Sequence, residues 1–445
     1  MGRKGAEDVA VLGGGVAGMK AALDLAAMGR KVTLIEAGPS LGGKAVRGLS
    51  DDKFSKRDAT LDNISTLMMD VEWNKSVKVM TLTSVKGVTR DEKTKSYKLK
   101  LATKARHVFD VCTACQLCVD PCPVTVPNEF SEGVGSRKAV FLPYFYSSPR
   151  LYVIDEGTCL WYKDQSCRKC EEVCPVDAIR FDADQKDAES EVAVDAVVIA
   201  MGASPVGLDD FPKFGGGKLA GVLTVAQAQR LLDPAGPTGG EFRLTPGEAV
   251  SQLTVGQHHS AKAAQRAHAK NGERPKAIAF IQAKGKGEAW AENGHVTLRW
   301  AIEALKGVAA DAPGVKIHLF HDKESGASMK GQLIGIQKQL GAATYDVEPS
   351  KVESHGGKVV VTYAAADGEK RLEVDAAVIA PPIAPPESLK ELAPQFGIKV
   401  DEFGYAVPEG RVQVAGPAKG PMTLDEVFED ASHAVARLLT TLARA

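Results

Sequence analysis

Alternating apolar and polar stretches predict an α/β unit at the start of the chain. An apolar run at residues 8–12 is followed by an amphipathic pattern at 16–28, with apolar side chains at helical spacing. A second apolar run follows at 32–35, and Gly29 is placed to end the helix before it. This order of strand, helix and strand predicts the beginning of a parallel sheet.

The second half of the chain repeats this alternation. Apolar strands are predicted at 276–282, 315–320 and 358–364, and amphipathic helices at 295–309 and 328–340. Strands that alternate with helices in this way are typical of a parallel sheet with crossover helices. We therefore expect a second α/β lobe.

Two apolar strands of nearly the same sequence lie far apart in the chain. Residues 194–200 read Val-Asp-Ala-Val-Val-Ile-Ala, and residues 374–380 differ from them only at the fourth position. The first copy continues into Met201-Gly202 and the second into Pro381-Pro382. Between the first α/β unit and residue 103, alternating strands are predicted at 77–82 and 97–101.

The stretch 233–275 is rich in Gly, Pro, Ala and polar residues, which predicts a long connector. Its His258 and His259 are read as a solvated pair rather than metal ligands, because no cysteine or acid lies beside them at a ligand spacing. In the second lobe, the first turn at 283–288 is not a good G-x-G-x-x-G, which argues against a nicotinamide nucleotide there. The two lysines of this turn could bind the acidic surface of a partner, but we interpret the segment as a solvated turn.

Composition narrows the class of protein. At 445 residues, two or three domains are expected. The net charge of −1 argues against a general nucleic-acid binder. No apolar run has the length of a membrane span, and the amino terminus lacks the apolar stretch of a signal peptide. We expect a cytoplasmic protein, or one held at a membrane only through partner subunits.

The first candidate site is a dinucleotide signature. Gly13, Gly15 and Gly18 follow the first strand at the spacing G-x-G-x-x-G, and Glu36 ends the second strand. Glycines allow the backbone to approach a pyrophosphate, the helix amino terminus attracts its charge, and the acid bonds a ribose hydroxyl. The alternative, a glycine turn with a structural role alone, leaves Glu36 unexplained.

The second candidate site contains all eight cysteines, within residues 112–174. They form two runs, C-x2-C-x2-C-x3-C and C-x7-C-x2-C-x3-C, each followed by a proline: Cys112, Cys115, Cys118 and Cys122, then Cys159, Cys167, Cys170 and Cys174. Such runs wrap cubane iron-sulfur clusters, and two copies indicate two [4Fe-4S] clusters. Structural zinc and disulfides are the alternatives, but zinc does not explain three closely spaced cysteines before C-P, and disulfides need an oxidising compartment.

In bacterial two-cluster ferredoxins the fourth cysteine of each run serves the other cluster. Carried onto this chain, that rule gives two quartets. The first quartet is Cys112, Cys115, Cys118 and Cys174, and the second quartet is Cys122, Cys159, Cys167 and Cys170. Between the two runs, the aromatic residues 144–146 are expected to shield the clusters from water.

Several stretches resemble flavoproteins with two dinucleotide-binding domains. Gly42-Gly43 is similar to their pyrophosphate-side loop, which implies FAD rather than NAD, although an ordinary turn is the alternative. Strand 194–200 with Gly202 resembles their second FAD signature. The segment with Gly416, Lys419 and Gly420, before a helix from about residue 424, resembles their carboxy-terminal FAD contact, and implies a positive helix end aimed at the flavin.

Together these features resemble the A subunits of heterodisulfide reductase and of quinone-interacting membrane-bound oxidoreductase. The likeness is carried by residues 11–19, by 127–133 with 137–139, by 159–162 and by 236–240. It implies a two-dinucleotide-binding-domain α/β flavoprotein with an inserted bacterial-type 2[4Fe-4S] ferredoxin domain. The implied layout is FAD-binding segments at 1–103, 186–232 and 381–445, the ferredoxin-like insertion at 104–185, the connector at 233–275, and a degenerate NAD-type lobe at 276–380.

The resemblance implies an oxidoreductase subunit that relays electrons between FAD and two clusters to other redox subunits. A quinone-linked membrane-associated complex of sulfur metabolism, an NAD(P)H-dependent flavin oxidoreductase, and a wiring scaffold with a structural flavin are the alternatives. The sequence does not decide whether the chain forms a homodimer. It shows no Ser/His/Asp or paired-carboxylate arrangement for hydrolytic chemistry. Unlike most of that family, the chain has no cysteine in 44–101 or 283–302, so no further cluster is expected.

Overall fold

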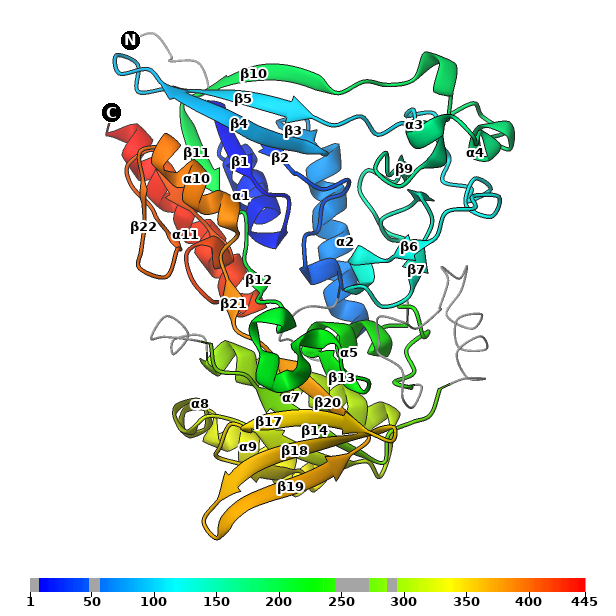
Figure 1. The fold of residues 1–445 in the computed structure, drawn as a ribbon. Coiled ribbons are helices and arrows are strands. Elements are labelled where there is room, and N and C mark those ends of the chain that lie inside the picture. Colours follow the sequence, from blue (N-terminus) through cyan, green and yellow to red (C-terminus); the bar gives the residue numbers. More distant parts are fainter. Residues whose placement is uncertain (1–7, 48–56, 235, 245–271, 286–293, 445) are drawn as a thin grey trace.

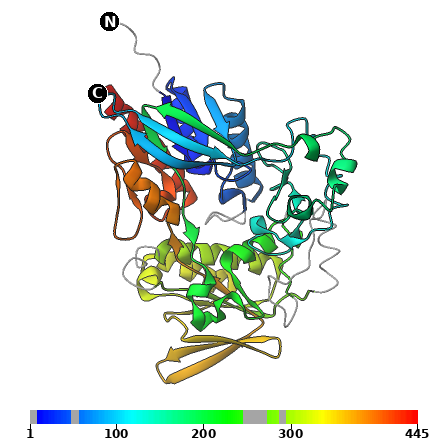
Figure 2. The same cartoon turned by 45° about the horizontal axis from the view of Figure 1, so that its top comes forward.

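The chain folds into three lobes, which Figure 1 shows in the computed structural model. The structure describes residues 8–47, 57–234, 236–244, 272–285 and 294–444. The first lobe lies above the second, and a smaller lobe lies beside helix α2 (Arg57–Trp73). Figure 2, turned by 45°, separates the same three parts. We call the smaller lobe, residues 104–185, the cysteine lobe, because it contains all eight cysteines.

The first lobe is built on a five-stranded parallel sheet in the order β24-β11-β1-β2-β3. Its strands are β1 (Asp8–Leu12), β2 (Lys31–Ile35), β3 (Val77–Met80), β11 (Ala196–Ile199) and β24 (Val412–Val414). Helices α1 (Val16–Ala27), α2 and α11 (Leu424–Ala443) cover one face. Strand β1 is fully buried at Val9, Ala10 and Val11, because both faces of the sheet are covered. The predicted strand-helix-strand start and the return of 194–200 to the first sheet are confirmed.

An antiparallel sheet covers the other face together with helix α10 (Glu387–Gln395). Its order is β10-β5-β4, with β4 (Thr83–Arg90), β5 (Tyr97–Thr103) and β10 (Ala188–Val194). The cysteine lobe leaves the sheet after β5 and returns at β10, where Thr103 pairs with Ala188. The lobe is therefore an insertion between two neighbouring strands.

The cysteine lobe has little regular structure. Its elements are short: β6 (Val126–Pro127), β7 (Ser136–Arg137), β8 (Val140–Phe141), β9 (Val153–Ile154), α3 (Leu160–Asp164) and α4 (Lys169–Glu172). Its core mixes cysteine sulfurs with apolar side chains such as Val108, Ile154 and Ile179. Cysteine side chains therefore make up a large part of this small core.

The second lobe contains another parallel sheet, in the order β13-β20-β14-β15-β16. Its strands are β13 (Val222–Thr224), β14 (Ala277–Gln282), β15 (Lys316–Phe320), β16 (Ala343–Tyr345) and β20 (Ala376–Ala380), and its helices are α5 (Val225–Leu232), α7 (Gly294–Asp311), α8 (Lys323–Ser328) and α9 (Lys330–Leu340). Strand β13 and helix α5 belong to this lobe, although the sequence placed residues 222–232 with the first lobe.

One strand prediction in the second lobe was wrong. Strand β18 (Lys358–Ala365) does not join the parallel sheet but pairs antiparallel with β17 (Lys351–His355) and β19 (Gly368–Val374). Only two residues separate β18 from β19, and so short a connection can join antiparallel strands but not parallel ones. The strand that follows α9 in the parallel sheet is instead the short β16, which forms one of its two edges.

The chain crosses between the two large lobes twice at one place. Strand β12 (Ser204–Pro205) leads out of the first lobe and pairs with β21 (Ile383–Ala384), which leads back. After β21 come α10, β22 (Lys399–Val400) and β23 (Ala406–Val407), all on the first lobe. None of the helices in the described segments has the length and hydropathy of a membrane span.

Three lobes meet around the buried guanidinium of Arg230 on α5. Its Nη1 donates to the carboxylate of Asp233 at 2.8 Å and to the backbone oxygen of Arg47, from the first lobe, at 3.0 Å. The guanidinium lies 4.9 Å from the ring centre of Phe130, from the cysteine lobe. Arg47 lies over the same ring and pairs with Glu132 at 2.9 Å. One cation thus contacts all three lobes.

We expect Arg230→Leu to lower the free energy of unfolding by about 3 kcal/mol, because it removes the buried ion pair with Asp233 and the hydrogen bond to the Arg47 oxygen. Urea unfolding of the full chain measures this change. Arg371→Leu, on the exposed strand β19, is the matched control and should change it by less than about 0.5 kcal/mol. Equal effects of the two substitutions would contradict the role given to Arg230.

Candidate functional site

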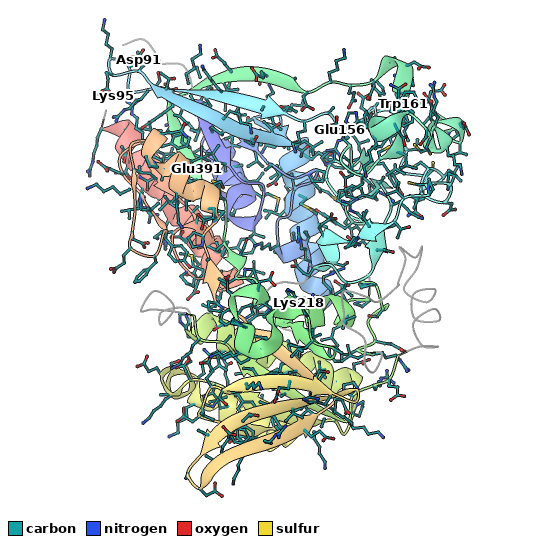
Figure 3. All side chains as sticks on the ribbon, viewed as in Figure 1. Asp91, Lys95, Glu156, Trp161, Lys218 and Glu391 are labelled. Atoms are coloured by element: carbon teal, nitrogen blue, oxygen red, sulfur yellow. The ribbon has the colours of Figure 1, made fainter. Side chains whose placement is uncertain are left out.

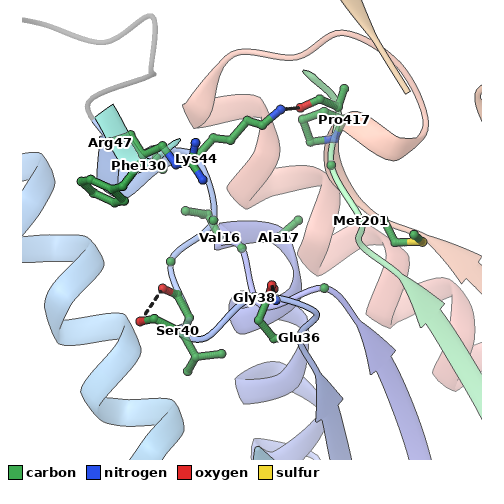
Figure 4. Close-up of a pocket in the computed structure, with 18 of the residues that line it drawn as sticks. Val16, Ala17, Glu36, Gly38, Ser40, Lys44, Arg47, Phe130, Met201 and Pro417 are labelled. Carbon is green, nitrogen blue, oxygen red and sulfur yellow. Dashed lines mark hydrogen bonds between the residues drawn. The ribbon is translucent and has the colours of Figure 1, made fainter. Parts of the chain in front are cut away.

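A cavity of about 580 Å³ opens at the carboxyl edge of the first parallel sheet. The loops after β1, β2 and β11 line it, which is where open α/β sheets bind their ligands. The second lobe contributes Val296 and Trp300 of α7, and the cysteine lobe contributes residues between Asn128 and Tyr144. The cavity therefore lies where all three lobes meet. Figure 4 shows it with residues of the first lobe and Phe130 of the cysteine lobe.

Glycines form the floor of this cavity. Gly13 has φ +108°, and a Cβ there would lie 2.3 Å from the backbone oxygen of Ala200. A Cβ on Gly18 would lie 1.8 Å from the oxygen of Gly13, so Gly18 allows α1 to pack closely on the strand. At Gly15 a Cβ would meet only the Cα of Gly43, at 3.9 Å, and would otherwise project into open space. The turn before α1 is thus a backbone surface suited to a pyrophosphate, and α1 has no acidic residue in its first turn.

The carboxylate of Glu36 lies at one end of the floor. It accepts hydrogen bonds from the backbone N–H groups of Gly14 and Gly38, each at 2.6 Å. Gly42 and Gly43 both have positive φ and lie against the first glycine turn, since Gly42 N–H donates to the Gly14 oxygen at 2.8 Å. The two glycine segments, separate in sequence, form one continuous surface.

The structure brings six of the ten predicted FAD-binding residues to the cavity wall. These are Gly13, Gly15, Glu36, Gly42, Gly43 and Gly202. Gly18 and Gly416 lie behind it; Gly416 has φ +66°, and a Cβ there would be 2.7 Å from the Cβ of Ala17. Lys419 forms an ion pair with the buried Asp430 at 2.6 Å. Lys419 and Gly420 do not line the cavity, whereas Pro417 and Pro421 do.

The beginning of α11 differs from the expectation of a positive helix end. Leu424 and Val427 of its first turn line the cavity. The helix begins with a capping box in which Thr423 and Glu426 satisfy each other's backbone N–H groups, and Asp425 is also in the first turn. Two carboxylates thus offset the positive end of the helix dipole.

Several cavity residues were missed by the sequence analysis. Tyr144, expected to shield a cluster, instead lines the cavity and donates to the Leu41 oxygen. Its neighbours Phe145 and Tyr146 are exposed, so the shielding prediction was wrong. Trp300 is held by a 2.7 Å hydrogen bond from its indole N–H to Gln229. Only the three-dimensional fold brings these residues to the glycine floor, and no local motif announces them.

Lys44 is a cation of the cavity wall that had no sequence signal beyond its place after Gly42-Gly43. Its Nζ donates to the backbone oxygen of Ala203 at 2.7 Å and to Ser204 Oγ. Figure 4 shows the side chain extending from the glycine loop toward the segment near Pro417. Burial lowers the pKa of Lys44 to about 8, despite the nearby Glu132 carboxylate.

The eight cysteines gather in two places in the cysteine lobe. Small cavities lie between the members of each quartet. Cys112, Cys115, Cys118 and Cys174 line one of them, and Cys122, Cys159, Cys167 and Cys170 line the other. These are the two sets given by the ferredoxin pairing rule, in which the last cysteine of each run joins the other set; their role as cluster ligands stays a prediction.

Two of the cysteine sulfurs accept hydrogen bonds from the backbone. Backbone N–H groups of Ala114 and Ala178 donate to the sulfurs of Cys112 and Cys174, at 3.4 and 3.2 Å. Burial raises the pKa of the Cys170 thiol to about 12 and also raises the pKa of Cys118, as do neighbouring cysteines. No group of His, Cys, Asp or Glu in the described residues is arranged to hold a single metal ion. A cubane cluster is larger than an ion, and its thiolates stand farther apart.

The turn after β14 is only partly described. Lys284 N–H donates to the Glu348 carboxylate at 2.7 Å, whereas Lys286, Gly287 and Glu288 lie outside the described residues. The side chain of Gln282 donates to the Gly294 oxygen at the start of α7, at 2.8 Å. His258 and His259 also lie outside the described residues.

The chain is similar to several known proteins. A family model described as FAD dependent oxidoreductase matches residues 8–118. The A subunit of the H2:CoB-CoM heterodisulfide, ferredoxin reductase of Methanothermobacter marburgensis is 27% identical, over 96% of this chain and 62% of that protein. An iron-sulfur A subunit of the CoB–CoM heterodisulfide reductase of Methanopyrus kandleri is 30% identical, over 97% of this chain and 64% of that protein. The thioredoxin reductase structure of Lactococcus lactis matches with a TM-score of 0.49 and 12% identity, covering 99% of this chain and 100% of that chain.

The chain spans less than two thirds of the length of these two curated relatives. The match nevertheless covers nearly all of this chain, including the cysteine lobe. The chain is therefore similar over nearly its full length to the A subunits of heterodisulfide reductases, and it has the α/β fold of an FAD-dependent oxidoreductase.

Proposed function

We propose that this chain is an electron-transfer subunit of a heterodisulfide reductase-like oxidoreductase complex, with FAD in the large cavity and a [4Fe-4S] cluster in each cysteine quartet. One observation carries the proposal: the glycine-floored cavity shares a wall with the cysteine lobe, from Asn128 to Tyr144. Other redox subunits would exchange electrons with it. FAD handles electrons in pairs and a cubane cluster handles them singly, so together they connect two-electron and one-electron chemistry.

The residues of the cavity have separate tasks in this proposal. The turn at Gly13 and Gly15 and the amino terminus of α1 would hold the pyrophosphate, and Glu36 the ribose. Apolar and aromatic side chains, among them Phe130, Tyr144 and Trp300, would exclude water from the flavin ring. No side chain is required as acid or base, because the redox chemistry belongs to the cofactors.

The cysteine side chains of the two quartets support iron-sulfur clusters rather than disulfide bridges. All eight cysteines are free thiols, and four of them are buried in an otherwise apolar core. Buried thiolates need a cationic centre to offset the cost of burying charge. The N–H groups directed at Cys112 and Cys174 are of the kind that tunes cluster potentials.

Substitution of Gly15, in the glycine turn before α1, tests the proposed flavin site. Gly15 has φ −76°, which any residue adopts, and a side chain there would fill the cavity floor. We expect Gly15→Val to fold normally and to bind FAD about tenfold to a hundredfold more weakly, since overpacking costs about 1–3 kcal/mol. Titration of FAD fluorescence measures this. Gly207→Val is the matched control, with φ −64° and open space around it, and should bind FAD like the unaltered chain.

The iron-sulfur proposal predicts a composition. Anaerobically purified protein should contain about eight iron and eight acid-labile sulfide per chain, from two [4Fe-4S] clusters. Cys118→Ser and Cys170→Ser, one in each quartet, should each lower both values to about four. Metal and sulfide analysis measures them, and a chain that contained zinc and no sulfide would refute the proposal.

The pKa of Lys44 predicts a pH dependence of FAD binding. Below about pH 8 the ammonium is charged and attracts the pyrophosphate, and above it the neutral amine does not. FAD affinity should therefore fall as the pH rises through 8. In Lys44→Met the affinity should be lower and independent of pH between 7 and 10, whereas in Lys44→Arg it should stay high. A slope in Lys44→Met equal to that of the unaltered chain would show that another group titrates.

A further inference from the structure

The two cysteine quartets differ in their distance from solvent. In the second quartet Cys122, Cys159 and Cys170 are buried and Cys167 is half-buried. In the first quartet only Cys118 is buried, and Cys115 is exposed. The first quartet is therefore the more exposed of the two.

The second quartet lies directly behind the wall of the large cavity. Val140 and Phe141 are consecutive residues of β8; Val140 lines the second quartet, and Phe141 lines the large cavity. Arg137 of the cavity wall donates to the Asp155 carboxylate at 2.8 Å, and the Asp155 backbone oxygen accepts from Cys159 N–H at 2.9 Å. Strand β8 therefore lies between the large cavity and the second quartet.

An apolar patch surrounds the exposed quartet. Its members are the exposed side chains of Val111, Leu117, Val173 and Val176. Leu117 and Val176 line the same small cavity as the first quartet, and Val111 and Val173 directly precede Cys112 and Cys174. Apolar side chains that contribute nothing to a core, gathered around one site, are typical of an interaction surface.

The two chain segments that form this patch carry charges of one sign. Segments 110–120 and 172–178 contain four carboxylates, Asp110, Asp120, Glu172 and Asp177, and no Lys or Arg. All four are exposed. Arg180, the nearest cation in sequence, lies over the ring of Phe109 at 4.2 Å. Four thiolates per cluster add further negative charge, so the surface is complementary to a basic one.

We propose that the second quartet is the cluster site next to the flavin and that the first quartet is the exchange point with a partner protein. The partner docks on the patch of Val111, Leu117, Val173 and Val176 with an apolar centre and a basic rim, and carries a one-electron redox group near that face. This inference rests on the proposed function and adds to it the order of the clusters and the chemistry of the partner.

The electron count of this route is balanced. Oxidation of one reduced flavin releases two electrons and two protons. The electrons pass singly through the second and then the first quartet and reduce two molecules of a one-electron acceptor, and the protons go to the solvent. The reverse flow uses the same sites.

The docking surface is tested with cytochrome c, a basic one-electron acceptor, mixed with the photoreduced, cofactor-loaded full chain. The triple substitution D110N/E172Q/D177N should lower the second-order rate of cytochrome c reduction about tenfold at low ionic strength, because electrostatic steering is lost. Val111→Lys, at a patch residue that does not line the small cavity of the first quartet, should also lower it, with unchanged iron content. In the unaltered chain the rate should fall as ionic strength rises.

Matched controls lie on other lobes. E391Q/E402Q/E409Q changes the charge by the same amount near α10, which Figure 3 shows at Glu391 on the opposite side from Trp161 of the cysteine lobe. Ile334→Lys, on α9, is the control for Val111→Lys. The controls should leave the rate unchanged. Equal rates in test and control variants would overturn the proposed surface.

The order of the clusters is tested by rapid-freeze electron paramagnetic resonance of Cys115→Ser and Cys167→Ser. When the first quartet is disrupted by Cys115→Ser, the remaining cluster should still equilibrate rapidly with the flavin, although cytochrome c reduction is lost. When the second is disrupted by Cys167→Ser, the remaining cluster should equilibrate slowly. The opposite pattern would overturn the order. A chain without flavin or sulfide would instead refute the proposed function, before either comparison is made.

Discussion

The ion pair between Arg137 and Asp155 ties the large cavity to the second cysteine quartet. Arg137 lies in the cavity wall, Asp155 holds the N–H of Cys159, and the pair spans β7 and the loop after β9. Glu129 adds a second carboxylate to the same guanidinium at 2.6 Å. Electron transfer depends steeply on distance, and this network around the buried Arg137 holds the cavity wall and the second quartet at a fixed separation, on which exchange between flavin and clusters would depend.

Most of the first lobe could be predicted because its signals are local. Strand, glycine turn, helix and acid follow one another within residues 8–36, and the fold places them as expected. The second lobe was harder. Strand β18 is apolar enough for a central strand, and only its short connection to β19 makes it antiparallel. Strand β13 lies far along the chain from its neighbour β20, and a strand of only three residues is too short to show a pattern of apolar and polar positions.

The candidate site was predictable where backbone geometry requires a particular residue. Glycine at positions 13, 15, 42 and 43 leaves a visible pattern, and so does cysteine spacing. Side chains brought by other lobes leave none: Trp300 reaches the cavity from α7, and Tyr144 from the cysteine lobe. Lys419 lies in the expected segment, but it forms an ion pair with Asp430 and does not line the cavity. The sequence pattern does not reveal this ion pair.

The way in which the cysteine lobe joins the first lobe has a consequence for the history of the chain. Because Thr103 and Ala188 are paired neighbours in one sheet, the lobe begins and ends at the same point. Such a cassette could be gained or excised with only a short hairpin needed to reconnect the strands. Insertion of such a segment leaves the strand order of the parallel sheet beneath it unchanged.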